Sequence, residues 1–156
     1  MVAGLTSDYQ DYQNWLDNQN TITEKALELI KQFGFKAILI HQERKPNFVR
    51  ITIGKKRLDF FMKSVRSRFV KSVWLCKKED FNIRNNYLIY MEKEEKFLIS
   101  TGGEIDKKAE FRDSEYHKDV KYIVVPMDMF RSAKVFLKAM KNRYDAMMQR
   151  RMNDFI

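Results

Sequence analysis

One carboxylate stands out because of the side chains around it. Asp59 is one of only two acidic residues between positions 34 and 78, and it lies inside the apolar run LDFF. Alternate residues of a strand share a face, which places Arg57, Asp59 and Lys63 together. A carboxylate among cations could hold Mg²⁺ at a phosphate while a lysine stabilises the charge at phosphorus. It could equally form a cross-strand ion pair, and the sequence leaves both interpretations open.

A magnesium site needs a second carboxylate, because one acid leaves the ion mostly hydrated and poorly placed. Asp59 would be the first metal ligand. The candidates for the second are Glu24, Glu28, Glu43, Glu79 and Asp80. Such a site would make Mg²⁺ the cofactor of an enzyme that hydrolyses phosphodiesters, and without it no cofactor is expected.

Positive charge is concentrated in two parts of the chain. The stretch FFMKSVRSRFVKSVWLCKK (60–78) holds six lysines and arginines and no carboxylate. Residues 34–78 carry thirteen basic and two acidic side chains, and residues 121–156 carry eight and three, whereas residues 1–33 and 79–120 are net acidic. If the two basic segments lie side by side in the fold, they make one basic face, which is typical of phosphate binding.

This charge pattern predicts a nucleic-acid-binding protein, with DNA expected ahead of RNA and no membrane partner. The residues expected to contact nucleic acid are Lys55, Lys56, Arg57, Arg66, Arg68 and Lys71, flanked by Arg131, Lys134 and Lys138. The alternative is a non-catalytic adaptor that uses the same basic face on nucleic acid or on an acidic protein partner.

The hydrophobic periodicity predicts elements that would position these residues. A capping box at Thr21-Ile-Thr-Glu24 and an apolar stripe up to Phe33 predict a helix at 22–33, after a polar lead-in at 1–20. Asp128 is expected to open a long helix. Strands are expected at 36–42, 47–53, 57–63, 68–78, 86–92, 96–101 and 121–126, with a hairpin turn at Gly54-Lys55-Lys56.

These elements make an α+β protein with a mainly antiparallel sheet of about five to seven strands. The N-terminal helix and the long C-terminal helix are expected to pack on the sheet. Residues 1–156 form one domain, in which 21–126 hold the first helix and the sheet and 127–156 the last helix. The segment 101–120 has no clear pattern.

The order of these elements resembles the core of the PD-(D/E)XK endonucleases. In that family an acid on one strand and an acid-x-Lys on the next bind the metal and assist the attack of water. The resemblance makes Asp59 the strand acid, Lys77 or Lys63 the catalytic lysine, and Glu24 or Glu28 the helix acid. Leu75 stands where the family has its second acid, so a binding protein without cleavage also fits the pattern.

Other classes of protein are excluded or disfavoured by simple counts. One cysteine, Cys76, and two histidines leave no zinc-site spacing and no internal disulfide. No phosphate-binding glycine loop, signal peptide or long apolar span is present, so a soluble cytoplasmic protein is expected. The methionine-rich segment 140–156 predicts a homodimer through the C-terminal helix.

Overall fold

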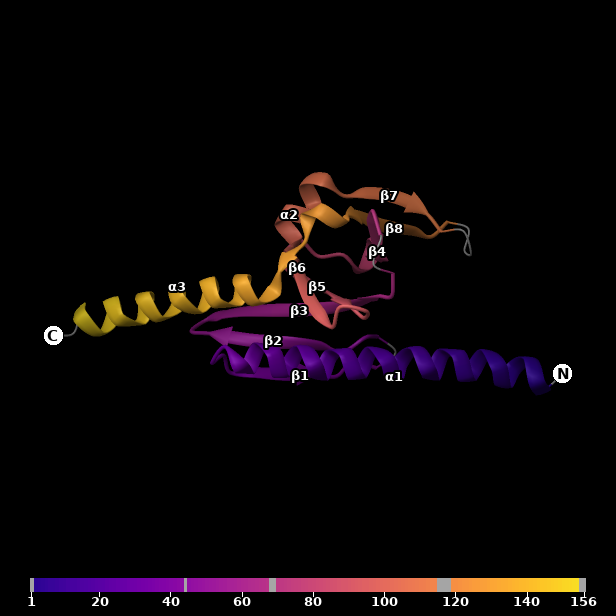
Figure 1. The fold of residues 1–156 in the computed structure, drawn as a ribbon, viewed down its shortest axis with the longest axis horizontal. Helices are drawn as coiled ribbons and strands as arrows, with labels where there is room; N and C mark the ends of the chain where they lie inside the picture. The colour runs from indigo at the N-terminus through magenta and orange to yellow at the C-terminus, as the bar shows by residue number, and fades with distance from the viewer. Residues whose placement is uncertain (1, 44, 68–69, 115–118, 155–156) are drawn as a thin grey trace.

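The computed structural model describes residues 2–43, 45–67, 70–114 and 119–154, and it is an α+β protein as predicted (Figure 1). Three layers follow one another: a long helix, a six-stranded sheet and a three-stranded sheet. The elements are α1 (Val2–Gln32), β1 (Ala37–Ile40), β2 (Phe48–Ile53), β3 (Lys56–Val65), β4 (Ser72–Lys77), η1 (Lys78–Asp80), β5 (Asn86–Met91), β6 (Lys96–Thr101), α2 (Gly102–Lys108), β7 (Glu110–Asp113), β8 (Lys121–Pro126), η2 (Met127–Met129), β9 (Arg131–Ser132) and α3 (Ala133–Asp154).

Helix α1 is much longer than the predicted helix at 22–33. It is continuous from Val2, so the polar lead-in is helical and the capping box does not start a helix. The hydroxyls of Thr21 and Thr23 instead donate to the carbonyl oxygens of Asp17 and Gln19, one turn earlier, at 2.9 and 2.7 Å. This bond satisfies each hydroxyl within the helix, so a threonine that is typical of a helix start is accommodated inside one.

The central sheet has the strand order β1-β2-β3-β5-β6-β9. Four of its five strand pairs are antiparallel, and β3 runs parallel to β5. The predicted hairpins at 47–63 and 86–101 are confirmed as β2–β3 and β5–β6. Between β2 and β3 the chain turns at Gly54, whose φ of +60° lies in the left-handed region that glycine tolerates.

The second sheet, with the order β4-β8-β7, was not predicted as a separate layer. The expected strands 57–63 and 68–78 follow each other in the sequence but do not pair: β4 pairs with β8, and the edge of β3 is taken by β5. Composition alone could not decide this, because each of these strands is apolar enough to fill either position. The segment left unassigned at 101–120 contains α2 and β7.

The core has two parts, one on each side of the central sheet. Between α1 and the sheet lie Ile30, Val49, Ile51, Phe60 and Leu88, all fully buried. Between the two sheets lies a second group of buried residues, Val73, Ile89, Ile105, Ile123 and Val125. Successive residues of β3 and β5 thus serve opposite cores, as the alternation of side chains along a strand requires.

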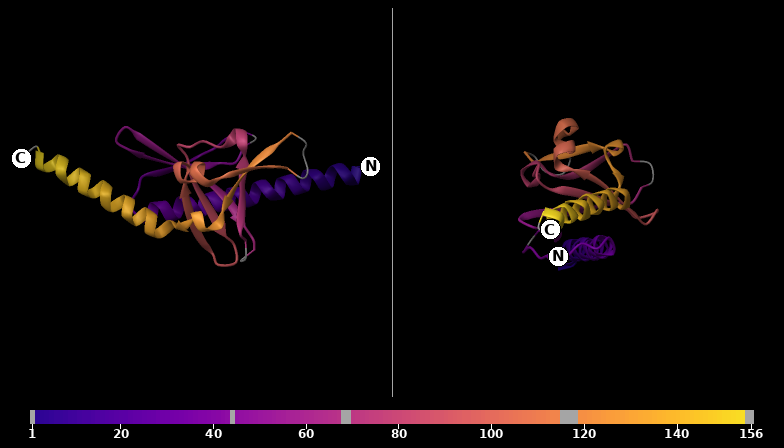
Figure 2. Two further views of the ribbon diagram at one scale, coloured as in Figure 1. Left: turned by 90° about the horizontal axis from the view of Figure 1, so that it is seen from above. Right: turned by 90° about the vertical axis from the view of Figure 1, so that its left-hand side faces the viewer.

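Helix α3 starts later than predicted and leaves the body of the protein. Asp128 lies in η2, a short strand β9 follows, and the helix begins at Ala133, so the prediction of a helix from Asp128 is wrong at its start. Ala133 and Leu137 are fully buried against the α1 side of the sheet. The distal half of α3 and the N-terminal part of α1 project in opposite directions (Figure 2).

Candidate nucleic-acid interface

The β2–β3 hairpin and helix α3 together border a surface that is hollowed and basic. One hollow of about 650 Å³ is lined by Ile53, Gly54, Lys55, Lys56, Tyr144, Met147, Met148 and Arg151. A second, of about 940 Å³, is lined by Lys31, Gly34, Phe35, Lys36, Ala37, Ile38, Arg50, Thr52, Ile53, Gly54, Lys141 and Tyr144. Ile53, Gly54 and Tyr144 border both hollows, so the two adjoin. We call this surface the basic groove.

The basic groove brings the two basic segments of the sequence together. Lys36, Arg50, Lys55 and Lys56 come from the segment 34–78, and Lys141 and Arg151 from the C-terminal helix. With Lys31 this makes seven cations among the lining residues and no carboxylate. The condition stated from the sequence, that the two segments lie side by side, is met at this surface.

Two of the seven cations are neutralised by carboxylates just outside the lining. Arg50 forms an ion pair with Asp59, and Lys141 pairs with Asp145 at 3.2 Å one turn along α3. Among the residues that the structure describes, the other five have no carboxylate within 4 Å. The groove therefore carries uncompensated positive charge, which is the electrostatic condition for binding a polyanion.

The pair of Arg50 and Asp59 is held by strand register. The two residues face each other across β2 and β3, and the guanidinium donates to both carboxylate oxygens, at 2.8 and 3.2 Å. Each side chain is about three-quarters buried, and the hydrogen bond to Asp59 raises the pKa of Arg50. Of the two interpretations of Asp59, a cross-strand ion pair and a metal ligand, this geometry is that of the ion pair.

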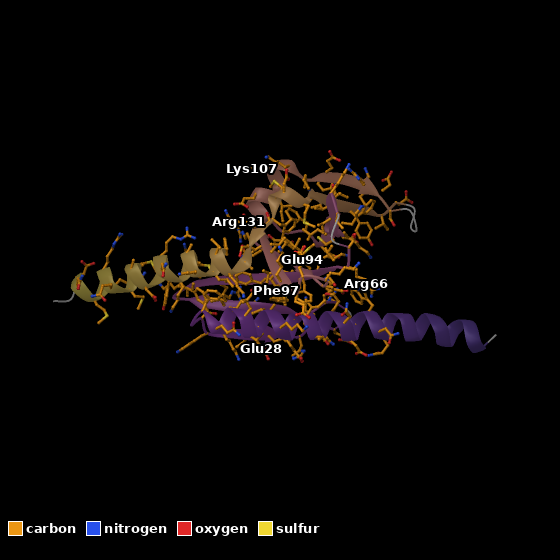
Figure 3. The ribbon with its side chains drawn as sticks, in the orientation of Figure 1. Glu28, Arg66, Glu94, Phe97, Lys107 and Arg131 are labelled. Carbon is orange, nitrogen blue, oxygen red and sulfur yellow. The ribbon has the colours of Figure 1, made fainter. Side chains whose placement is uncertain are left out.

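The remaining predicted nucleic-acid contacts are dispersed. Arg66 pairs with Glu92 at 3.7 Å and Arg131 with Glu104 at 3.2 Å, and the two arginines lie well apart in Figure 3. Of the other predicted contacts outside the groove, Arg57, Lys71, Lys134 and Lys138 are exposed and have no carboxylate of the described residues within 4 Å. Arg68 lies outside the described residues.

The predicted metal ligands also come from separate places. Glu24 and Glu28 belong to α1, with Glu28 at its outer side in Figure 3, and Glu43 lies in the loop between β1 and β2. Within the described residues, no group of three or more His, Cys, Asp or Glu side chains is arranged to hold a metal ion. The carboxylate of Asp59 is already engaged by Arg50. The prediction of a magnesium site at Asp59 stays a prediction.

The two predicted catalytic lysines do not lie beside Asp59. Lys77 ends β4 in the second sheet and is exposed. Lys63 lies four residues further along β3, which is a rise of about 13 Å, and borders a separate cavity between the sheets. Burial lowers the pKa of Lys63 there and raises that of its neighbour Cys76 to about 12, so the thiol stays protonated near neutral pH.

The likeness of the chain to known proteins lies in structure rather than in sequence. No protein-family profile matches it, and no curated protein sequence matches it. Among solved structures it is similar to a nuclease from a fusselovirus, with 13% sequence identity over 92% of this chain and 95% of that chain and a TM-score of 0.43. None of the helices in the described residues is both long and apolar enough to cross a membrane.

Sequence reasoning missed several residues of the basic groove. Lys31, Lys36 and Arg50 were not among the expected contacts, and neither were Lys141 and Arg151. Lys141 continues the row of cations at three- and four-residue steps along the last helix, which is a signal for it. No such pattern marks the others, because the turn after α1, the β2–β3 hairpin and α3 come together only in the folded chain.

Proposed function

We propose that this protein binds nucleic acid along the basic groove. The observation that carries the proposal is a pair of adjoining hollows lined by seven cations and no carboxylate, built from segments far apart in the sequence. Lysine and arginine side chains that contact phosphates release the counterions condensed on the polyanion, which drives binding without reading the base sequence. Five uncompensated cations give this surface the charge for several such contacts.

The shape of the groove supports a strand or duplex rather than a small anion. Its cations are spread from the turn after α1, past the β2–β3 hairpin, to Arg151 near the end of α3. Phosphates of a nucleic acid are spaced regularly along an extended backbone, so a row of cations matches it better than a compact cluster would. DNA is the partner that we propose first, and RNA is the comparison.

The test is an electrophoretic mobility shift with duplex DNA, single-stranded DNA and duplex RNA at several salt concentrations. We expect submicromolar affinity at low salt and a steep, linear fall of the logarithm of the affinity with the logarithm of salt concentration. A double variant, Lys55→Glu with Lys56→Glu, is expected to bind about tenfold or more weakly. For duplex DNA, its salt slope should be smaller by about 0.9 for each phosphate that the variant no longer neutralises.

A matched control makes the same change in charge elsewhere. Lys107 and Lys108 are exposed on α2, on the far side of the molecule from α1 (Figure 3). Lys107→Glu with Lys108→Glu should leave the salt slope unchanged. Equal loss of affinity in both double variants would mean that only net charge matters, and it would contradict the assignment of nucleic-acid binding to the groove. No shift with any nucleic acid, together with a stable complex with an acidic protein, would favour the adaptor alternative.

Cleavage is a separate prediction from binding. We infer a finer function, that of a small magnesium-dependent endonuclease, as a proposal separate from binding. Cleavage requires a metal ion at Asp59, and that ion must displace Arg50 from the carboxylate. Incubation of supercoiled plasmid with Mg²⁺ or Mn²⁺ against a chelator tests it. Nicking that needs the metal and disappears in Asp59→Asn, while binding persists, would support the enzyme. Its absence on all substrates leaves binding as the function.

A further inference from the structure

A second site lies at the other end of the central sheet from the basic groove. A cavity of about 330 Å³ is lined by Gln42, Lys45, Pro46, Phe61, Met62, Lys63, Leu75, Cys76, Glu79, Asp80, Phe81, Asn82, Asn85 and Tyr87. It lies beside the start of β2, whereas the basic groove lies beside Gly54 at the end of that strand. The two sites share no lining residue and are separated by the length of β2, about 20 Å.

Lys63 supplies hydrogen-bond donors that have no acidic partner. Its neighbours Phe60 and Met62 belong to the core against α1, so alternation along β3 turns Lys63 toward the space between the two sheets. In the described part of the chain no carboxylate lies within 4 Å of its amine. An ammonium group that is largely withdrawn from water costs free energy unless it gains acceptors. A ligand with acceptor atoms would provide them.

Aromatic rings form a wall of the same cavity. The rings of Phe81 and Tyr87 are stacked with centroids 5.7 Å apart, and the centroid of Phe61 lies 6.1 Å from that of Tyr87. Phe61 is in turn stacked on Phe48 at 4.7 Å, which fixes its position. Flat heteroaromatic ligands such as nucleobases pack favourably on a wall of this kind.

The loop at 79–85 places acceptors in the cavity as well. Glu79, Asp80, Asn82 and Asn85, whose side chains all carry acceptor oxygens, are among its lining residues. Hydrogen bonds to neighbouring elements hold the loop in place: the Asn82 N–H donates to the Tyr87 hydroxyl at 3.1 Å, and the Gly102 N–H donates to the Asn85 carbonyl at 2.7 Å. The backbone that carries these polar side chains is thus positioned before any ligand binds.

These groups match one nucleobase better than the others. Guanine has two acceptors, O6 and N7, on one edge, and two donor groups, N1–H and the N2 amino group, on the adjoining edge. A lysine is a suitable partner for O6 and N7, and a carboxylate for the two donors. Adenine has an amino donor where guanine has O6, which would oppose the Lys63 ammonium.

We propose that the cavity between the two sheets binds a guanine base, with Lys63 donating to its acceptor edge, Asp80 accepting from its donor edge, and Phe81, which is backed by Tyr87, packing on its face. The base can come from a free guanine nucleotide or from an unpaired guanine in a strand. The proposal does not rest on the basic groove, because no residue is common to the two sites.

Isothermal titration calorimetry of the full chain with GMP, AMP, CMP and UMP tests the site. We expect one GMP per chain and a preference of about tenfold or more over AMP. Lys63→Met and Asp80→Ala should each weaken GMP binding by about tenfold. Lys107→Met, on α2 and outside the lining of both sites, should leave it unchanged. Thermal unfolding of each variant shows whether it is folded, and Asp80→Ala, at an exposed position, provides the test if Lys63→Met fails to fold.

Oligonucleotides distinguish the two sources of the base. An oligo-dT strand with a single central dG is compared with the same strand without it. Preference for the dG strand, lost in Lys63→Met but kept in Lys107→Glu, would place a strand's guanine in the cavity, whereas tight GMP binding without that preference would indicate a free nucleotide. Failure of GMP and of the dG strand to bind preferentially, or equal binding in Lys63→Met, would overturn the proposal. Loss of duplex DNA binding in the Lys55→Glu and Lys56→Glu variant with GMP binding intact would leave both proposals standing.

Discussion

At the scale of single residues, Asp59 is the point where the ion-pair and the metal-site interpretations separate. Asp59→Asn removes the charge that Arg50 contacts while keeping one acceptor oxygen, so we expect the free energy of unfolding to fall by about 0.5–1 kcal/mol. Binding of nucleic acid should become stronger, because Arg50 borders the basic groove and would lose its neutralising partner. Urea unfolding and mobility shifts measure the two effects.

Asp145→Asn is the matched control for this substitution. It removes the acidic partner of Lys141, another cation of the groove, and Asp145 is more exposed than Asp59. The free energy of unfolding should therefore fall by only about 0.3 kcal/mol, with a similar gain in nucleic-acid binding. Weaker binding in Asp59→Asn alone, with or without added Mg²⁺, would contradict the electrostatic account and favour a direct role for that carboxylate.

Lys63 gives a pH dependence with a definite sign. Burial lowers its pKa in the folded chain below the ordinary value of 10.5, so between these two values the unfolded chain holds more protons. The contribution of Lys63 to the free energy of unfolding therefore rises with pH across that interval, and below it the full cost of the buried charge is present.

Lys63→Met should accordingly stabilise the protein by about 0.5–2 kcal/mol at neutral pH while it removes the proposed guanine site, since stability and function often oppose each other at such positions. The stabilisation should shrink as the pH approaches 10.5. Urea unfolding at about pH 7 and about pH 10, with the exposed Lys55→Met as reference, checks this. A Lys63→Met variant that is less stable than the unchanged protein at neutral pH would contradict this prediction.

At the scale of elements, the start of α2 supports the loop that lines the cavity. A Cβ at Gly102 would lie 2.5 Å from the Ile83 carbonyl oxygen and 2.8 Å from that of Asn82, and both are backbone atoms that cannot move aside. We expect Gly102→Ala to lower the free energy of unfolding by about 1–3 kcal/mol and to weaken GMP binding by displacing the loop.

The next residue provides the control. A Cβ at Gly103 meets no atom within 4 Å, and the position is inside the helix. Gly103→Ala should therefore be neutral or stabilise by up to about 1 kcal/mol, because alanine favours the helical conformation. Urea unfolding of the pair should give opposite signs. Equal stability of the two variants would show that the loop at 82–85 is free to move away from α2.

At the scale of the whole molecule, the projecting end of α3 bears on assembly. Met147, Met148 and Met152 are 40%, 38% and 60% exposed, and the homodimer through residues 140–156 stays a prediction. A two-fold dimer would bring Lys141, Arg143, Arg150 and Arg151 of both copies together, so association should strengthen with salt, which screens this repulsion. Nucleic-acid binding should change in the opposite direction.

Light scattering over a range of concentrations and salt measures the assembly. We expect the mass to approach twice 18.8 kDa at high concentration and salt, and Met152→Glu to return it to the monomer. Val135→Glu is the control, because Val135 is exposed on α3 but lies outside the segment 140–156. A monomer mass under all conditions would contradict the predicted homodimer.

Local features of the sequence determined most of the elements of this protein. Strand alternation and the Gly54 turn predicted the β2–β3 hairpin, and the run KYIVVP predicted β8 at residues 121–126. These succeed because side-chain alternation and turn conformation depend on residues close together in the chain. The uneven charge distribution likewise predicted which segments would be basic, since net charge is a sum that needs no fold.

Only the tertiary structure decided which strands pair and which charges meet. The β3 edge could pair with β4 or with β5, and both are apolar; the competition is settled by packing of the whole chain. That choice separates Lys77 from Asp59 and turns Lys63 into the cavity between the sheets. The basic groove arises the same way, because Lys55 and Arg151 line one hollow, and Lys36 and Lys141 the adjoining one, only when α3 lies beside the hairpin. Contacts between distant segments depend on the packing of the complete fold, and no local pattern in the sequence encodes them.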